Sequence, residues 1–150
     1  MPNIHGLILA LLTALFFLRV LGQALVAYAS VGWLPTMQHW APGLIPYPAL
    51  LAIQIVMLAV MIKISTDIWR GKGFFAAPRL SSARFLIGFS AIYAGSMVLR
   101  YVLTMIFQPE MRWLGGAIPI FFHFVLAAFI YTLGRFHSHE AIFARPERAC

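Results

Sequence analysis

Apolar residues run along this chain in four long stretches, separated by short segments rich in proline, glycine and charge. A helix that crosses a membrane needs about 20 mostly apolar residues, and each stretch reaches that length. No stretch alternates apolar and polar residues as a half-buried strand does. The sequence therefore predicts an all-α protein, a bundle of four transmembrane helices forming one domain. The predicted spans are Leu7–Val31, Ala49–Trp69, Phe85–Phe107 and Ala117–Arg135, with a tail over residues 136–150.

Composition supports this prediction. Of the 150 residues, 62% are hydrophobic and 10% are charged, and the mean hydropathy is +0.88. A soluble domain is nearer half apolar and a quarter charged, and one of this size still exposes about a third of its chain surface. These proportions exclude a soluble globular protein. The formal net charge of +7 then indicates that basic residues lie at the cytoplasmic ends of membrane spans. We expect no nucleic-acid partner.

The distribution of lysine and arginine predicts the orientation. Basic residues gather in the loop between the second and third spans and in the tail, whereas the opposite side has Arg112, which faces Glu110. Because cytoplasmic loops carry the excess of basic residues, we expect both termini and the middle loop in the cytoplasm. The basic residues of the predicted cytoplasmic side are Arg70, Lys72, Arg79, Arg84, Arg135, Arg145 and Arg148.

One short motif bears on processing. The sequence Ala27-Tyr28-Ala29 resembles a signal-peptidase site after an apolar stretch. The first residues carry no lysine or arginine, however, and Arg19 interrupts the apolar run. We therefore expect the first stretch to be retained as a span.

A short repeat precedes the second and fourth spans. Residues 40–46 and 113–119 both read W-x-x-G-x-I-P, and Leu-Arg pairs at Arg19 and Arg100 recur in the first and third spans. Two helical hairpins in parallel orientation would produce this pattern, related by an axis along the membrane normal. Such a bundle would place the two arginines on opposite sides of a shared centre. Tryptophan, glycine and proline are also common at any membrane interface, so chance recurrence is the alternative.

Polar side chains are concentrated in the outer half of the predicted bilayer. Charges at membrane depth cost about 2.5–3.5 kcal/mol each on insertion scales, and they usually face a bundle interior or cavity. The inner half holds little besides Thr13, Lys63, Tyr93 and Tyr131. We predict a polar chamber open to the non-cytoplasmic side, and its expected ligand-binding residues are Arg19, Gln23, Gln54, Arg100 and His123.

The charge balance inside the spans indicates what this chamber binds. None of the four acidic residues (Asp67, Glu110, Glu140 and Glu147) is expected within a span, and only Glu110 is near enough to pair with one of the arginines. Guanidinium stays protonated, so its donors require carbonyls, ring faces, water or an external anion. An anionic lipid, a quinone oxygen or a carboxylate of a partner protein would fit. The alternative is that both arginines snorkel to the interface.

The histidines raise two further hypotheses. His123 lies well inside the bilayer, but a b-type haem requires a second imidazole on a facing helix, and only His39 in the outer loop remains as a candidate. Haem is therefore disfavoured, and the cofactor is undetermined. His5, His137, His139 and Glu140 could bind a divalent metal, although a His-x-His pair on a helix points to different sides. Cys150, the single cysteine, forms no intrachain disulfide.

No nucleotide-binding or hydrolase motif is found in the sequence. Our leading hypothesis is a non-catalytic accessory or lipid-handling protein that binds a lipophilic ligand or a partner subunit. The alternatives are a small intramembrane enzyme or carrier, with His123 as acid/base and the two arginines on substrate, and a haem-bearing electron-transfer subunit. Small residues at Gly88, Ala91 and Gly95 favour close helix packing, within the bundle, in a larger membrane complex or in a homo-oligomer.

Overall fold

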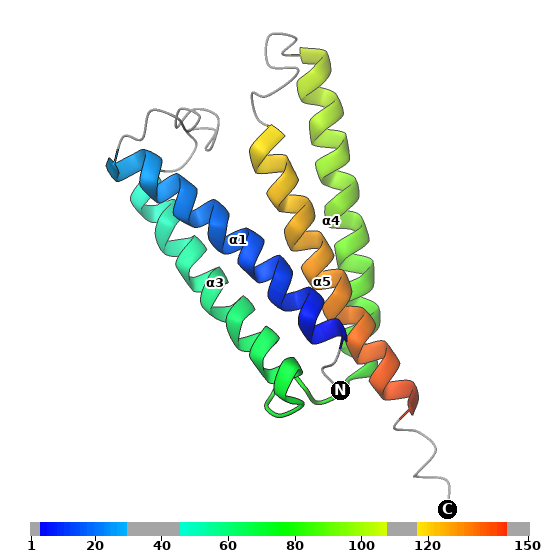
Figure 1. Ribbon diagram of the computed structural model, residues 1–150. Helices are drawn as coiled ribbons and strands as arrows, with labels where there is room; N and C mark the ends of the chain where they lie inside the picture. The colour runs from blue at the N-terminus through cyan, green and yellow to red at the C-terminus, as the bar shows by residue number, and fades with distance from the viewer. Residues whose placement is uncertain (1–3, 30–45, 108–116, 144–150) are drawn as a thin grey trace, which may run out of the picture.

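The computed structural model describes residues 4–29, 46–107 and 117–143, which fold into four helices and, within those ranges, no strand (Figure 1). All four are long and apolar enough to cross a membrane. The prediction of an all-α protein with four spans is confirmed. Helix α5 continues past Arg135, where the fourth span was predicted to end. The helices are α1 (Ile4–Ala29), α3 (Tyr47–Arg70), α4 (Leu80–Phe107) and α5 (Ala117–Phe143).

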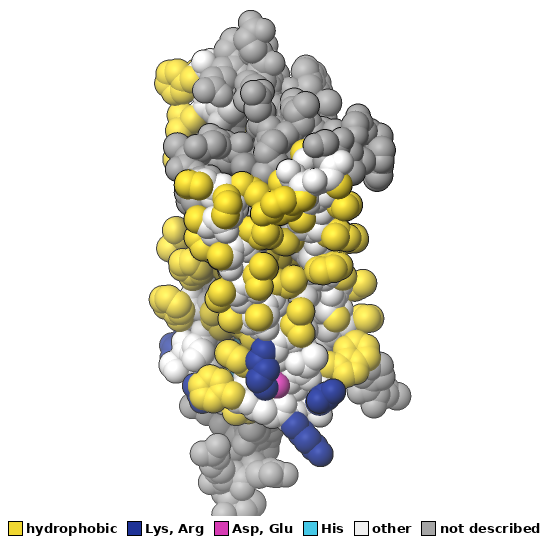
Figure 2. All heavy atoms as spheres, turned by 90° about the vertical axis from the view of Figure 1, so that its left-hand side faces the viewer, with side chains coloured by type: hydrophobic (Ala, Val, Ile, Leu, Met, Phe, Trp, Pro, Cys, Tyr) yellow, Lys and Arg dark blue, Asp and Glu magenta, His cyan; other side chains and the backbone are white. Residues whose placement is uncertain are grey.

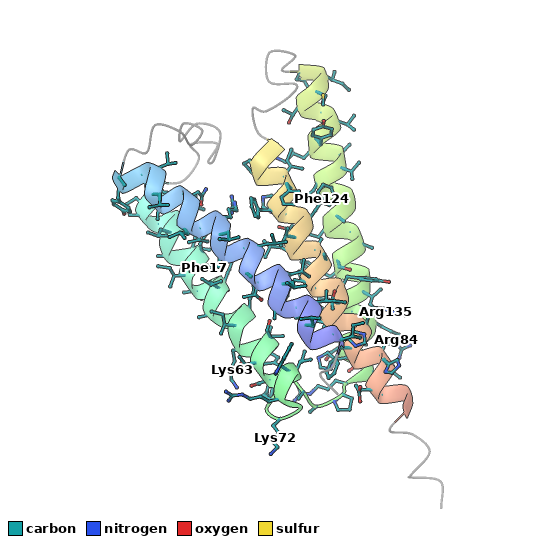
Figure 3. The ribbon with its side chains drawn as sticks, in the orientation of Figure 1. Phe17, Lys63, Lys72, Arg84, Phe124 and Arg135 are labelled. Atoms are coloured by element: carbon teal, nitrogen blue, oxygen red, sulfur yellow. The ribbon has the colours of Figure 1, made fainter. Side chains whose placement is uncertain are left out.

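The outside of the molecule is apolar, as a lipid-facing surface must be. Figure 2 shows hydrophobic side chains spread over the middle of one face, with lysine and arginine side chains gathered at the lower end of the described part. Lys63, Lys72, Arg84 and Arg135 come from different parts of the chain and mark this same end (Figure 3). We call it the loop end, because it carries the connection between α3 and α4.

The helices pack in the order α3, α1, α5, α4. Helix α1 contacts both α3 and α5, and α4 contacts α5; within the described ranges no comparably extensive contact joins α3 to α4. Two hairpins, α1 with α3 and α4 with α5, therefore meet along α1 and α5, and Figure 1 shows them diverging away from the loop end. The buried apolar core lies where α1, α3 and α5 meet: Leu9, Phe16, Val20, Met61, Ile64, Ile68, Phe129, Leu133 and Phe136.

The two hairpins differ in detail. Pro46 precedes α3 with an extended backbone (φ −55°, ψ 136°), whereas Pro119 lies inside α5. The remainder of the two W-x-x-G-x-I-P motifs, residues 40–45 and 113–116, lies outside the described residues. Helix α1 is packed on two sides and α4 on one, so the hairpins do not occupy equivalent positions in the packing.

The connection between α3 and α4 is tightly built. Gly71 ends α3 in the left-handed conformation (φ 62°), with its N–H donating to Ile68 O and the Lys72 N–H donating to Asp67 O. These two bonds form a Schellman motif, which satisfies carbonyls left open at a helix end. The Asp67 carboxylate accepts from Lys63 Nζ at 2.5 Å and from the Phe75 N–H at 3.5 Å. It thus fastens the loop to α3.

Asp67 corrects an expectation from the sequence. It was not counted among the acidic groups inside the membrane spans, yet it lies on the last turns of α3 and is 5% exposed. Its partner Lys63 sits four residues earlier with its side chain largely exposed. The position is tolerable because the ion pair and the loop N–H satisfy the carboxylate locally.

Glycine allows close helix approach at two places. A Cβ at Gly6 would lie 3.1 Å from the Trp69 Cα, and one at Gly134 would lie 2.9 Å from Ile87 Cγ1. The former brings α1 onto α3 and the latter brings α5 onto α4. By contrast, a Cβ at Gly88 or Gly95 would meet no atom within 4 Å. Those two glycines of the predicted packing stripe therefore face away from the other described helices.

Candidate functional site

Gln23 and Gln54 join α1 to α3 deep inside the first hairpin. The Gln54 Nε2 donates to Gln23 Oε1 at 2.8 Å, and the two residues are 0% and 3% exposed. The Gln54 Oε1 is buried and has no hydrogen-bond partner in the described structure. Two of the five predicted site residues are thus brought together, and one of them retains an open acceptor.

Arg19 lies half-buried one turn of α1 before Gln23, where the two hairpins meet. Its guanidinium carbon sits 5.2 Å from the centre of the Phe122 ring on α5. The Arg19 Nε is buried and donates to no acceptor in the described structure. In the part of the chain that the structure describes, the ion pairs found are Lys63–Asp67 and His139–Glu140, so neither described carboxylate neutralises Arg19. An aromatic face attracts the cation but does not take up its N–H donors.

His123 faces α4 and forms a hydrogen bond that the sequence did not predict. The Tyr93 hydroxyl and His123 Nδ1 are 2.5 Å apart, with the two rings edge to face. Tyr93 had been assigned to the inner half, away from His123. It lies about 21 Å along α4 from Phe107, at 1.5 Å per residue, because α4 extends well beyond the start of α5. The pairing of Tyr93 with His123 depends on the register of the two packed helices. The spacing of residues within one span does not reveal that register.

The remaining candidate, Arg100, is exposed on α4. The hydroxyls one turn to either side of it bond to their own helix: Thr104 Oγ1 donates to Arg100 O, and Ser96 Oγ donates to Tyr93 O. The charge of Arg100 still acts on His123, as does that of Arg19. Arg100 therefore contributes to the electrostatic field around the pair, and its part in binding stays a prediction.

The other histidines are spread over two places. His137 is buried, whereas His139 is exposed and its ring lies 6.0 Å from that of His5. Among the described residues, no three His, Cys, Asp or Glu side chains gather at metal-binding distance. His39, the second candidate haem ligand, lies outside the described residues.

Together, Arg19, Phe122, His123 and Tyr93 form one cluster that spans α1, α5 and α4. We call it the hairpin cluster. It offers guanidinium donors that no described carboxylate meets, and a phenol hydrogen-bonded to an imidazole. A group with an acceptor oxygen would be held by the guanidinium, and the phenol–imidazole pair can donate or relay a proton. Sequence reasoning identified Arg19 and His123 of this cluster and missed Phe122 and Tyr93.

The fold defines the class: this is an integral, multi-pass, all-α membrane protein. Compared with models of protein families, with curated proteins and with solved structures, the chain has no significant match.

Proposed function

We propose that this protein binds a lipophilic molecule with an anionic or carbonyl oxygen at the hairpin cluster, in a non-catalytic accessory or lipid-handling role. One observation carries the proposal: the half-buried Arg19 guanidinium has a ring face but no carboxylate beside it in the described structure. A buried, unpaired cation is costly, and a ligand oxygen would remove that cost.

The position of the cluster supports a ligand that enters from the lipid phase. Arg19 lies where α1 and α5 run together, and both helices present apolar side chains to the surroundings, as Phe17 and Phe124 illustrate (Figure 3). A quinone carbonyl and a lipid phosphate oxygen share the chemistry that Arg19 requires. We further propose that the loop end faces the cytoplasm, since Lys63, Lys72, Arg84 and Arg135 gather there.

The Tyr93–His123 hydrogen bond favours a second candidate, an intramembrane enzyme or carrier that exchanges protons with its ligand. An imidazole that is hydrogen-bonded to a phenol can accept a proton from a ligand or donate one to it. The two candidates separate with His123→Gln. Under both candidates this variant should retain bound ligand, since Arg19 holds it. Only under the second candidate should the variant also lose turnover.

The experiment is native mass spectrometry of the full-length protein extracted gently from its own membrane. Wild-type protein should carry a discrete small-molecule mass, and Arg19→Leu should reduce its occupancy about tenfold, since hydrogen bonds to a charged group are worth roughly that factor. Arg135→Leu removes an exposed arginine of α5 and is the matched control; it should retain the adduct. Equal occupancy in Arg19→Leu and wild type, or a second protein chain in place of the small molecule, would overturn the proposal.

A further inference from the structure

A separate cavity of about 480 Å³ lies at the loop end, between the α3–α4 connection, the first turns of α4 and the last turns of α5. Its volume falls within the usual range for small-molecule sites. Phe74, Phe85 and Leu133 contribute apolar walls. Its polar lining comes from Arg79, Ser81, Ser82 and His137.

Arg79 supplies a fixed positive charge at this cavity. Its guanidinium carbon lies 4.4 Å from the centre of the Phe74 ring, so the side chain is held against the loop. Among the described residues, no carboxylate lines the cavity and none forms an ion pair with Arg79. The guanidinium donors are therefore free to meet an anion.

The start of α4 adds backbone donors beside Arg79. The first hydrogen bond of the helix runs from the Ala83 N–H to Arg79 O at 3.0 Å. The N–H groups of Leu80, Ser81 and Ser82 consequently have no acceptor within the helix. They carry the positive end of the helix dipole, and such ends bind phosphate.

His137 provides independent evidence that the cavity takes a ligand. The residue is 5% exposed, lines the cavity from α5, and its Nδ1 has no hydrogen-bond partner in the described structure. Buried polar groups are nearly always hydrogen-bonded, and each exception requires an explanation. A ligand that fills the cavity would lie against His137, beside Arg79 and the start of α4.

We propose that this cavity binds the phosphate of an anionic membrane lipid. Arg79, Ser81 and Ser82 at the start of α4 and His137 on α5 line one volume from two segments of the chain. An aromatic ladder on α4 leads away from the cavity: the Phe85 and Phe89 rings stack at 6.1 Å, and Phe89 stacks on Tyr93 at 6.0 Å. Phe85 and Phe89 are 69% and 45% exposed, which gives an acyl chain an apolar path along the helix. A free phosphate ion would leave this path unused.

The test uses full-length protein in phosphatidylcholine nanodiscs that contain a minor share of phosphatidic acid. After release into detergent, native mass spectrometry counts the retained lipids. Wild-type protein should retain phosphatidic acid in preference to phosphatidylcholine, and Arg79→Gln should reduce that retention about tenfold. Arg84→Gln removes an exposed arginine of α4 that does not line the cavity, and it should stay within about twofold of wild type, as surface charges contribute little.

A second variant keeps the test valid if Arg79→Gln folds poorly. Ser82→Asp places a carboxylate in the first turn of α4, which favours the helix but repels phosphate, so it should fold and lose the retained lipid. Equal losses of retained phosphatidic acid in Arg79→Gln and Arg84→Gln would show that general surface charge causes the retention, and would overturn the proposal. Displacement of phosphatidic acid by an equal concentration of inorganic phosphate would identify a free-phosphate site and overturn the lipid assignment.

Discussion

Replacing Gly134 with leucine should separate α4 from α5 and destabilise the second hairpin. A Cβ at this position would lie 2.9 Å from Ile87 Cγ1, 3.2 Å from the Ile87 backbone nitrogen and 3.2 Å from Leu86 Cβ. Ile87 Cγ1 is bonded to a branched Cβ whose rotamer is restricted in a helix, and the backbone nitrogen cannot move without α4. Overpacking of this kind costs about 1–3 kcal/mol, and α4 has no other extensive contact in the described structure to hold it.

Thermal unfolding of the detergent-solubilised protein, followed by size-exclusion chromatography, would measure this effect. Gly95→Leu is the matched control, because a Cβ at Gly95 meets no atom within 4 Å. We expect a clear drop in melting temperature for Gly134→Leu and none for Gly95→Leu. Similar drops in both variants would show that α4 and α5 do not meet at Gly134.

Replacing Gly73 with alanine should open the connection between α3 and α4. Gly73 has φ 115°, a conformation that L-residues rarely adopt, and an added Cβ would lie 2.5 Å from the Asp67 carboxylate. Backbone strain of this kind costs about 1–3 kcal/mol. The clash adds to it, since the carboxylate is fixed by Lys63 and by the Phe75 N–H.

Gly71→Ala is the control for this second prediction. Gly71 is also left-handed (φ 62°), but a Cβ there meets nothing within 4 Å, so only the conformational cost of about 1–2 kcal/mol applies. The rate of limited proteolysis in the α3–α4 loop and the melting temperature would be measured for both variants. Together they would rank the two variants. Faster cleavage of Gly71→Ala than of Gly73→Ala would contradict the account of how Asp67 holds the loop.

The four spans were predictable because apolar length alone specifies a transmembrane helix. The extension of α5 from Arg135 to Phe143 was not, because residues 135–140 are mostly polar and the helix there is held by tertiary contacts. Phe136 enters the core, and the His5 ring lies 6.0 Å from it. Neither contact can be read from the local sequence.

The candidate site was predictable in part for a similar reason. Arg19 is conspicuous as a charge in an apolar run, and Gln23 follows it by one helical turn. The Tyr93–His123 pair depends on how far α4 slides along α5, which no motif records. The cavity at the loop end depends on the fold of residues 71–79 beneath α4 and α5, and sequence reasoning identified no site among the arginines there.

Photo-crosslinking at the hairpin cluster tests the central claim most directly. Benzoylphenylalanine would replace Phe122 in the full-length protein within its own membrane, and the captured small molecule would be identified by mass spectrometry. The same substitution at Phe17, an exposed residue of α1 (Figure 3), reports the bulk membrane lipids. We predict that position 122 captures a lipophile enriched over the bulk, that Arg19→Leu abolishes this enrichment and that Arg135→Leu preserves it. If the molecules captured at position 122 match those captured at position 17, both in the wild type and in Arg19→Leu, the account is contradicted.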